Sequence, residues 1–398
     1  MKISIKPLTE DAQPQFCPTC HSSLVERGIL WQGLHVLKKY RCSSCNSEIV
    51  KDIPLFYSAN FPFTVNRKKN ILYGPKNAQK WLGTPLTHSL QNPMGQSVTL
   101  RRIVRAKSKQ ITMINCLDSI YGHSLCKLLA FDQAKKENPD EAIGLIIPKN
   151  LEWMAPADAN EIWVVDLPLQ AQEQYFTHLE QQIFKNMEDY ERVYLFSGSI
   201  NPTNIDIKKY TQIHPYSEIK RNERIVTFIW RTDANKFRMW CPIILTRILR
   251  KLRLISLLNV WQYVMVIILF WVVKKNIADC KFIIAGQGKT LKFPKWIQDS
   301  RSNQYSDKSE KEACAIYAQS TVIIGIHGSH MLLPSAHANV IIDMIPSIYC
   351  SNAMDDLIIN EIDPQKAVYR YRNIPMTFNM ADLSVIITNI IREKKFSV

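Results

Sequence analysis

Short apolar runs alternate with longer amphipathic segments over most of this 398-residue chain, and this rhythm restricts its fold more than any other feature. ITMIN (111–115), AIGLII (142–147) and EIWVVDL (161–167) have the length of buried strands. Helical patterns over 121–136 and 170–187 follow the first and third of them. Strands that alternate with helices form parallel sheets with crossover connections, so the sequence predicts an α/β fold.

The rhythm occurs twice. A polar stretch around 198–222 ends the first half, and RIVTFIW (224–230) begins the second. Further strands are expected at 192–197 in the first half and at 281–286, 321–327 and 340–346 in the second. One helix is expected from Asp307 to about 319, since Asp307 and Glu310 have the spacing of a capping box. A closing helix is expected from Met380 to about Lys394. We therefore expect two Rossmann-like domains facing a cleft, at 58–220 and 221–398, with ligands beyond the carboxyl ends of the strands. Residues 58–108 read as a polar connector within the first of them.

A separate small domain is predicted at 1–57. Cys17-Pro-Thr-Cys20 and Cys42-Ser-Ser-Cys45 form two Cys-x-x-Cys pairs, and 21 residues separate them. Two such pairs supply four thiolates in tetrahedral geometry, which suits zinc. Neither pair opens a helix in a βαβ pattern, which argues against a redox role. The sequence thus predicts a zinc ribbon with a structural ion.

The segment between the two cysteine pairs is basic and aromatic. It contains, among others, Trp31, His35, Lys38, Lys39, Tyr40 and Arg41. Such a mixture could contact RNA, and it could equally form a hairpin with a few packing residues, which is the interpretation we favour.

Composition places the chain among globular proteins with an affinity for anions. The hydrophobic content is 46%, and 50 Lys and Arg against 35 Asp and Glu give a formal net charge of +15. Such a balance favours polyanionic or phosphate-bearing partners without choosing among them. Six further cysteines are scattered, and the start of the chain has no apolar signal-peptide core. We therefore expect a cytoplasmic location, where paired cysteines more often bind metal than form disulfides.

One apolar run is long enough to span a bilayer. Residues 254–273 read LISLLNVWQYVMVIILFWVV, and positive charge flanks both ends, so the positive-inside rule gives no orientation. The polar residues Ser256, Asn259 and Gln262 interrupt it. A span here would separate the strand at 224–230 from its partner at 281–286. We favour a buried helix or one that touches an anionic membrane from the inner face.

The strongest chemical signal in the second half is the turn after the strand at 321–327. Gly328 permits a tight turn, and Ser329 could cap the helix that follows. Backbone N–H groups and a helix dipole at such a turn favour an anion. His327, at the tip of the strand, could add a donor to a diphosphate, although a buried histidine in an ordinary turn fits the spacing as well.

This segment resembles the donor site of glycosyltransferase family 61 and related enzymes. These sequences carry a Gly-x-His-Gly core, an apolar helix and a strand ending near an acidic residue and proline; the matching residues here are Gly325, His327, Gly328, Asp343 and Pro346. In the first half, Asp118 to His123 resembles that family's segment with a Gly-His or Phe-His pair before a helix. The resemblance covers patches of 110–350 and leaves out the ribbon. It implies the two-domain glycosyltransferase (GT-B) fold and a nucleotide-sugar donor.

Further donor-site residues are expected where other strands of the second half end. Arg231 and Asp233 follow the strand at 224–230, where a guanidinium could neutralise phosphate. Gly286 and Gly288 follow the next strand and could let backbone approach the donor, or form a plain turn.

His123 and Asp118 are the expected catalytic residues of the first half. An inverting transferase needs a base that takes the proton of the acceptor hydroxyl, and either side chain could serve. The alternative is that Asp118 caps a helix and His123 packs. The chain contains no Asp-x-Asp, the spacing with which many transferases hold a divalent metal, so we expect metal-independent transfer.

These features together favour a glycosyltransferase that moves a sugar to a glycan or lipid-linked acceptor in cell-surface polysaccharide synthesis. The runner-up is a zinc-ribbon RNA-binding or RNA-modifying protein, although no RNP-like motif occurs. A methyltransferase would need a glycine cluster that ITMINCLDSIYGHS lacks. A noncatalytic scaffold with a transferase fold is also compatible with the sequence.

Overall fold

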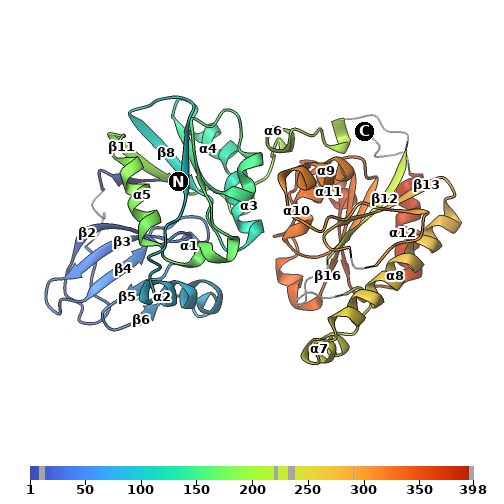
Figure 1. The fold of residues 1–398 in the computed structure, drawn as a ribbon, viewed down its shortest axis with the longest axis horizontal. Helices are drawn as coiled ribbons and strands as arrows, with labels where there is room; N and C mark the ends of the chain where they lie inside the picture. Colours follow the sequence, from blue (N-terminus) through green and yellow to red (C-terminus); the bar gives the residue numbers. More distant parts are fainter. Residues whose placement is uncertain (9–13, 219–222, 232–237, 290, 394–398) are drawn as a thin grey trace. The chain divides into compact units, whose positions relative to one another are not determined.

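The computed structural model describes residues 1–8, 14–218, 223–231, 238–289 and 291–393. The chain forms two compact units, Met1–Pro202 (unit 1) and Thr203–Val398 (unit 2). The division lies earlier in the chain than the domain boundary at 220/221 that the sequence suggested. Among the described residues the protein is a mixed α/β structure with three sheets (Figure 1).

The larger sheet of unit 1 has a parallel core and two antiparallel edges. Its strands lie in the order β1 (Lys2–Lys6), β11 (Arg192–Phe196), β8 (Gln110–Asn115), β9 (Ile143–Pro148), β10 (Glu161–Val165) and β7 (Leu100–Val104). The four central strands are parallel, whereas β1 pairs antiparallel with β11 and β7 pairs antiparallel with β10. The four expected strands are confirmed, but both edge strands come from segments with no predicted strand.

Two helices expected as continuous in unit 1 are interrupted. The segment 121–136 forms α3 (Tyr121–Leu129) and α4 (Phe131–Glu137), with a break at Ala130. The segment 170–187 begins as a 3₁₀ turn at Leu169–Glu173 and becomes helical only in α5 (Thr177–Met187). Apolar periodicity identifies the helical faces but not these breaks.

The ribbon sheet is larger than the sequence suggested. It runs in chain order through β2 (Leu24–Trp31), β3 (Val36–Cys42), β4 (Glu48–Asp52), β5 (Thr64–Asn66) and β6 (Ile71–Tyr73). The expected boundary at 57 and the expected polar connector at 58–108 are therefore wrong, since that segment also holds α1 (Tyr57–Asn60) and α2 (Thr84–Gln91). Its apolar face packs on α2 and on Tyr175, which makes it part of unit 1.

Unit 2 is built on one sheet in which all six strands are parallel. The order is β14 (Ile297–Asp299), β13 (Cys280–Gly286), β12 (Arg224–Trp230), β15 (Val322–Ile326), β16 (Val340–Ile345) and β17 (Tyr371–Pro375). Numbered along the chain, this is the order 3-2-1-4-5-6. The direction of strand addition reverses between β12 and β15, whose carboxyl ends are neighbours there.

The expected helices of unit 2 agree in place with the sequence, but one cap does not, and α6 (Ile207–Thr211) and α11 (Pro364–Arg370) lie in segments with no predicted helix. α9 (Asp307–Tyr317) is capped by Ser306, whose side chain accepts from Ser309 N–H at 3.1 Å, and not by Asp307. Asp307 already belongs to the helix, whereas Ser306 has the extended backbone that a capping residue needs. The closing helix α12 spans Met380–Arg392, and residue 394 lies outside the described part of the chain.

The long apolar run forms α8 (Ile255–Asn276), preceded by α7 (Ile243–Lys251). α8 is the one helix among the described residues with the length and hydropathy to cross a membrane, and a third of its most apolar 18-residue window is buried in the protein. Val266, Phe270 and Val273 belong to the core that includes Leu383 and Ile387 of α12. One face of α8 is therefore part of the fold of unit 2.

A buried histidine gives unit 2 a dependence on pH. His337 is fully buried; its Nδ1 lies 2.8 Å from the Leu333 carbonyl and its Nε2 lies 3.0 Å from Thr211 Oγ1. Burial lowers the pKa of His337 to about 4, against the hydrogen bond to Leu333, which raises it. Between pH 6.5 and about 4, His337 is therefore protonated in the unfolded chain but neutral in the folded chain.

We expect the stabilising effect of neutral His337 to be complete above pH 6.5 and to be lost as the pH falls toward 4. The loss is on the order of 3 kcal/mol from this pKa difference. Denaturant unfolding of the wild type and of H337Q between pH 7 and pH 4.5 isolates the effect, because other groups titrate in both proteins. Parallel pH profiles for the two proteins would show that His337 contributes no such dependence.

Candidate functional site

Four cysteines of the ribbon come together as the sequence predicts. The Sγ atoms of Cys17, Cys20, Cys42 and Cys45 all lie within 4.8 Å of one another. Cys17 and Cys45 are 3.8 Å apart, and Cys20 and Cys42 are 3.4 Å apart. Thiolates about 2.3 Å from a tetrahedral ion are separated by roughly 3.8 Å, so these four residues are close enough to hold a metal ion.

The backbone of each pair turns tightly around the cluster. His21 and Asn46, each just after the second cysteine of its pair, have the left-handed φ values of 59° and 55°. The N–H of Cys45 points at Cys42 Sγ at 3.5 Å. Hydrogen bonds from Ser47 lower the pKa of the Cys45 thiol to about 6, against burial, which raises it. The thiolate that a metal ion requires is therefore favoured at Cys45, whereas burial and the side-chain bonds to Cys20 and Cys45 raise the pKa of the Cys42 thiol to about 11.

Many residues between the two pairs, chiefly in the second half of this segment, face the inside of unit 1. Trp31, His35 and Tyr40 are buried, and so is Lys38. His35 Nδ1 lies 2.8 Å from Asp52 Oδ1, whose second oxygen accepts from the N–H of Phe63. The hypothesis that these side chains contact RNA is therefore wrong for the buried ones, since water and ligands do not reach them.

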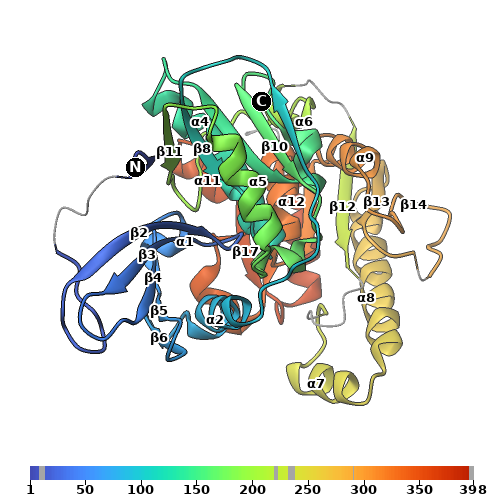
Figure 2. The same ribbon diagram turned by 60° about the vertical axis from the view of Figure 1, so that its left-hand side comes forward.

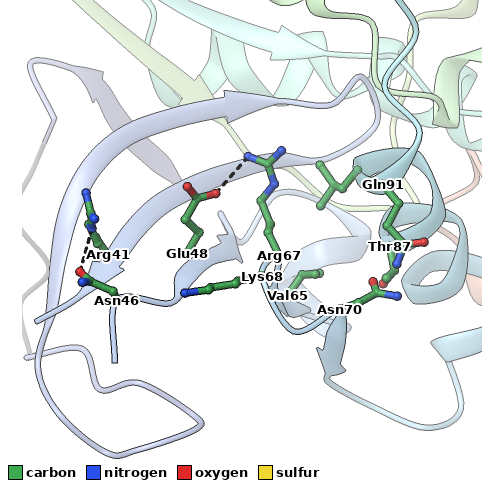
Figure 3. A pocket seen from close by; sticks show the side chains of 10 residues that line it. Arg41, Asn46, Glu48, Val65, Arg67, Lys68, Asn70, Thr87 and Gln91 are labelled. Atoms are coloured by element: carbon green, nitrogen blue, oxygen red, sulfur yellow. Dashed lines mark hydrogen bonds and ion pairs between the residues drawn. The ribbon is translucent and has the colours of Figure 1, made fainter. Parts of the chain in front are cut away.

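A pocket of about 670 Å³ opens where the ribbon sheet meets α2 (Figure 3). Its lining carries Arg41, Arg67 and Lys68 against the single carboxylate of Glu48. Arg67 Nη1 lies 3.8 Å from Glu48 Oε2, and Arg41 donates to Asn46 at 3.1 Å. The sequence analysis did not identify this pocket, because its cations come from two separate hairpins.

His123 and Asp118 form a pair just beyond the carboxyl end of β8. His123 Nδ1 lies 3.3 Å from Asp118 Oδ1, and Lys127 donates to Asp118 Oδ2 at 2.8 Å. Burial alone would raise the pKa of Asp118, but the charge of Lys127 and the bond to His123 outweigh it and hold the pKa well below its usual range. Asp118 is thus an enclosed carboxylate whose surroundings favour its ionised form.

Only the histidine of this pair keeps an accessible edge. The side chain of His123 is 19% exposed, whereas that of Asp118 is 2% exposed. The His123 ring stacks on Tyr57 with 4.0 Å between centroids and meets the edge of Trp81 at 5.8 Å. Asp118 is therefore suited to orient the imidazole, and His123 to exchange a proton. Lys127, Tyr57 and Trp81 were missed from the sequence.

In unit 2, the ends of β12 and β15 bring two expected residues together. Arg231, which follows β12, donates to His330 Nδ1. A Cβ on Gly328 would lie 2.7 Å from Arg231 Nη1, and Gly328 has a φ of 146°, so glycine is required for this approach. Arg231 and the turn after β15 thus form one cluster. Asp233 lies outside the described residues.

His327 is held by two carboxylates. Its Nδ1 lies 2.6 Å from Asp343 Oδ2, and its Nε2 lies 3.2 Å from Asp356 Oδ2. Burial lowers the pKa of His327, but the bond to Asp343 and the charge of Asp356 outweigh it and raise the pKa. Burial also raises the pKa of Asp343. Since both ring nitrogens already face carboxylates, the expectation that His327 donates directly to a diphosphate does not agree with this geometry.

The turn after β15 also differs from the expected helix start. Ser329 begins a short 3₁₀ turn and makes no capping hydrogen bond, and α10 (Leu332–His337) has only six residues. A helix this short has a weak dipole at its start, and the dipole acts mainly over the first turn. The expected anion site at this helix is therefore not formed by the helix itself.

The two glycines after β13 serve the fold. Gly286 has a φ of 108°, and a Cβ there would lie 2.2 Å from the carbonyl oxygen of Trp230. The N–H of Gly288 donates to the Ser302 carbonyl, and Arg301 donates to the carbonyl of Gly288. The backbone of this turn is thus engaged within unit 2, which supports the interpretation of a plain turn over a donor contact.

Comparisons with known proteins do not add to this geometry. No model of a known protein family matches the chain, and no curated protein sequence matches it either.

Proposed function

We propose that the protein is a glycosyltransferase that moves a sugar from a nucleotide-sugar donor to a glycan or lipid-linked acceptor without a catalytic metal. In this proposal both parallel sheets are Rossmann-like, unit 1 binds the acceptor and unit 2 binds the donor. The observation that carries it is the strand order 3-2-1-4-5-6 of unit 2 with the Arg231–His330 pair at the reversal between β12 and β15. Such sheets bind nucleotides at the carboxyl ends of the strands where the order reverses.

Arg231 would neutralise the charge that develops on the donor. When the bond between the sugar carbon and the diphosphate oxygen breaks, the electron pair stays on the diphosphate. A fixed guanidinium lowers the energy of that charge more in a dry site than in water. His327 acts indirectly here: its two carboxylate contacts hold the turn that carries Gly328 against Arg231.

His123 would accept the proton of the acceptor hydroxyl as its oxygen bonds to the sugar carbon. The charge of Asp118, whose Oδ1 lies 3.3 Å from Nδ1, would favour a proton on that nitrogen and leave Nε2 to act as the base. Lys127 keeps Asp118 ionised, so the carboxylate orients the ring without taking the proton itself. This division of roles replaces the interchangeable roles that the sequence suggested.

We expect R231A to weaken the binding of nucleoside diphosphates and to lower sugar transfer by roughly 10²–10³, the usual cost of losing a preorganised donor. The matched control is R224A, because Arg224 begins the same strand and pairs with Asp279 on the surface. Calorimetry with nucleoside diphosphates and transfer assays with a panel of nucleotide sugars provide the measurement. Equal binding and turnover in R231A and wild type would place the donor site elsewhere.

We expect H123A to behave in the opposite way, with donor binding preserved and transfer lowered by roughly 10²–10⁴, the usual contribution of a positioned base. H178A in the same unit is the control. D118N should also lower turnover and preserve donor binding, because the amide no longer holds the imidazole tautomer. If H123A transferred sugar at the wild-type rate, His123 would not be the base.

The metal held by the four cysteines is, in this proposal, structural zinc. Four thiolates in tetrahedral spacing and the absence of an open ligand position in this set suit zinc in a folding role.

We expect purified protein to contain about one zinc per chain. C42S should lose this zinc, and C350S should retain it, because Cys350 is exposed and lies outside the cluster. Loss should lower the stability of the ribbon sheet first, because metal binding contributes to its folding. Metal analysis without zinc would contradict this.

A second candidate function rests on the basic pocket of the ribbon. Arg41, Arg67 and Lys68 line a pocket open to solvent, and such a surface suits the phosphates of RNA. In this case the affinity of the chain for RNA would fall steeply with salt concentration. R67A/K68A would reduce RNA binding and make its salt dependence less steep, whereas the control K107Q would change neither. Salt-steep RNA binding without affinity for any nucleoside diphosphate would favour this function over transfer.

A further inference from the structure

One side of α8 exposes a continuous apolar stripe to solvent. We define the outer stripe as Leu257, Val260, Val264, Ile268 and Trp271, which are 39–50% exposed. Their spacings of three and four residues place them on one face of the helix. The opposite face, with Leu258, Val266 and Phe270 among others, is buried. α8 is therefore apolar on both faces, although the described residues of unit 2 cover only one of them.

Two polar residues near the middle of α8, Asn259 and Gln262, also face the protein. Asn259 Oδ1 accepts from Arg238 at 2.9 Å, and Gln262 Oε1 accepts from the N–H of Met239 at 3.0 Å. The indole of Trp261 donates to the carbonyl of Met239. The side chains of Asn259 and Gln262 are thus buried inside unit 2, whereas Ser256 is exposed at the start of the helix. The outer stripe therefore has no polar side chain between Leu257 and Trp271.

A surface helix normally turns charged residues toward water, and α8 does not. The sequence has no charged residue at all between Arg253 and Lys274. No acidic residue occurs anywhere between Asp233 and Asp279, whereas cations gather at both ends of the helix. They are Arg247, Arg250, Lys251 and Arg253 before the stripe, and Lys274 and Lys275 after it.

α7 extends this surface. Ile244 is 72% exposed, Ile248 is 49% exposed and Leu252 is 60% exposed, at the helical spacing of four. Figures 1 and 2 show α7 and the start of α8 reaching beyond the sheet of unit 2. At the other end, Lys275 Nζ lies 3.4 Å from the centre of the Trp271 ring, which places a cation beside an aromatic side chain.

We propose that α7 and the outer stripe of α8 dock on the surface of an anionic lipid bilayer, with α8 lying in the plane of the interface. Apolar side chains enter the headgroup boundary, and the cations at both ends bind acidic headgroups. An aromatic ring beside a lysine suits this depth. This surface is independent of the proposed transfer chemistry and concerns unit 2 alone.

Two other occupants agree less well with these observations. A helix that spans the bilayer would carry lipid on all sides, yet the inner face of α8 is packed into the core of unit 2. A second copy of this chain would bring a second set of cations to the same face, without acidic residues between 234 and 278 to pair with them. Acidic lipid supplies the missing negative charge.

The test is cosedimentation of the full chain with vesicles of phosphatidylcholine, alone or mixed with phosphatidylglycerol. We expect binding to the mixed vesicles, weakened by salt, and release by alkaline carbonate. V260E/V264E should lower the affinity at least tenfold, and the control V368E should not, because Val368 is 74% exposed on α11 (Pro364–Arg370), away from this surface.

A second pair of variants tests the charges. R247Q/K251Q should lower the affinity by about fivefold for each charge removed, and K366Q on α11 should leave it unchanged. Unaltered binding of V260E/V264E would overturn the proposal. It would also fail if the protein stayed in the bilayer after the carbonate wash. A third contrary result would be a wild type that does not bind vesicles but forms dimers, which these substitutions dissociate. Nucleoside diphosphate binding by the same variants, which the proposal leaves unchanged, separates this failure from failure of the proposed function.

Discussion

Burial of parallel strands on both faces is the constraint on which the rest of this structure depends. A parallel strand with protein above and below is mostly apolar, as β12, β15 and β16 are apart from Arg224, Thr227 and Asp343. Apart from Asp343 of β16, the polar residues of the candidate sites therefore lie in the segments just beyond the strand ends. In unit 2 this places Arg231 and the turn at Gly328 side by side, and in unit 1 it places Asp118 and His123 just after β8. The same requirement recruits α8, whose inner face covers apolar side chains of the sheet.

The central strands could be predicted from the sequence because a fully buried strand leaves a continuous apolar run. The edge strands could not. β7 and β1 are only half buried and read as polar or mixed, and the partner of β1 lies nearly two hundred residues away. β5 and β6 have three residues each, which is too short for a period to show. The capping of α9 was misplaced by one residue because serine and aspartate suit the same position equally well.

The candidate sites show a similar limit. The cysteine cluster was predictable because its ligands and their spacing are both in the sequence. The surroundings of His327 were not, since Asp356 reaches it from a distant loop and changes the role that a strand-tip histidine can have. Lys127 likewise changes the role that Asp118 can have, because a lysine partner favours the charged form of a buried aspartate. The charged partners in the folded structure, more than the local sequence pattern, show which residue can act as a base and which one orients it.

The pairing of β1 with β11 has a consequence for biosynthesis. Residues 2–6 find their partner only at 192–196, so the sheet of unit 1 cannot close until almost the whole unit has left the ribosome. The two cysteine pairs, by contrast, are complete once residue 45 has emerged. While residues 46–191 are being made, the nascent chain would therefore hold both cysteine pairs, but β1 would have no partner strand. Strand edges of this kind invite pairing with other chains, so the nascent chain is open to aggregation at this edge until β11 has been made.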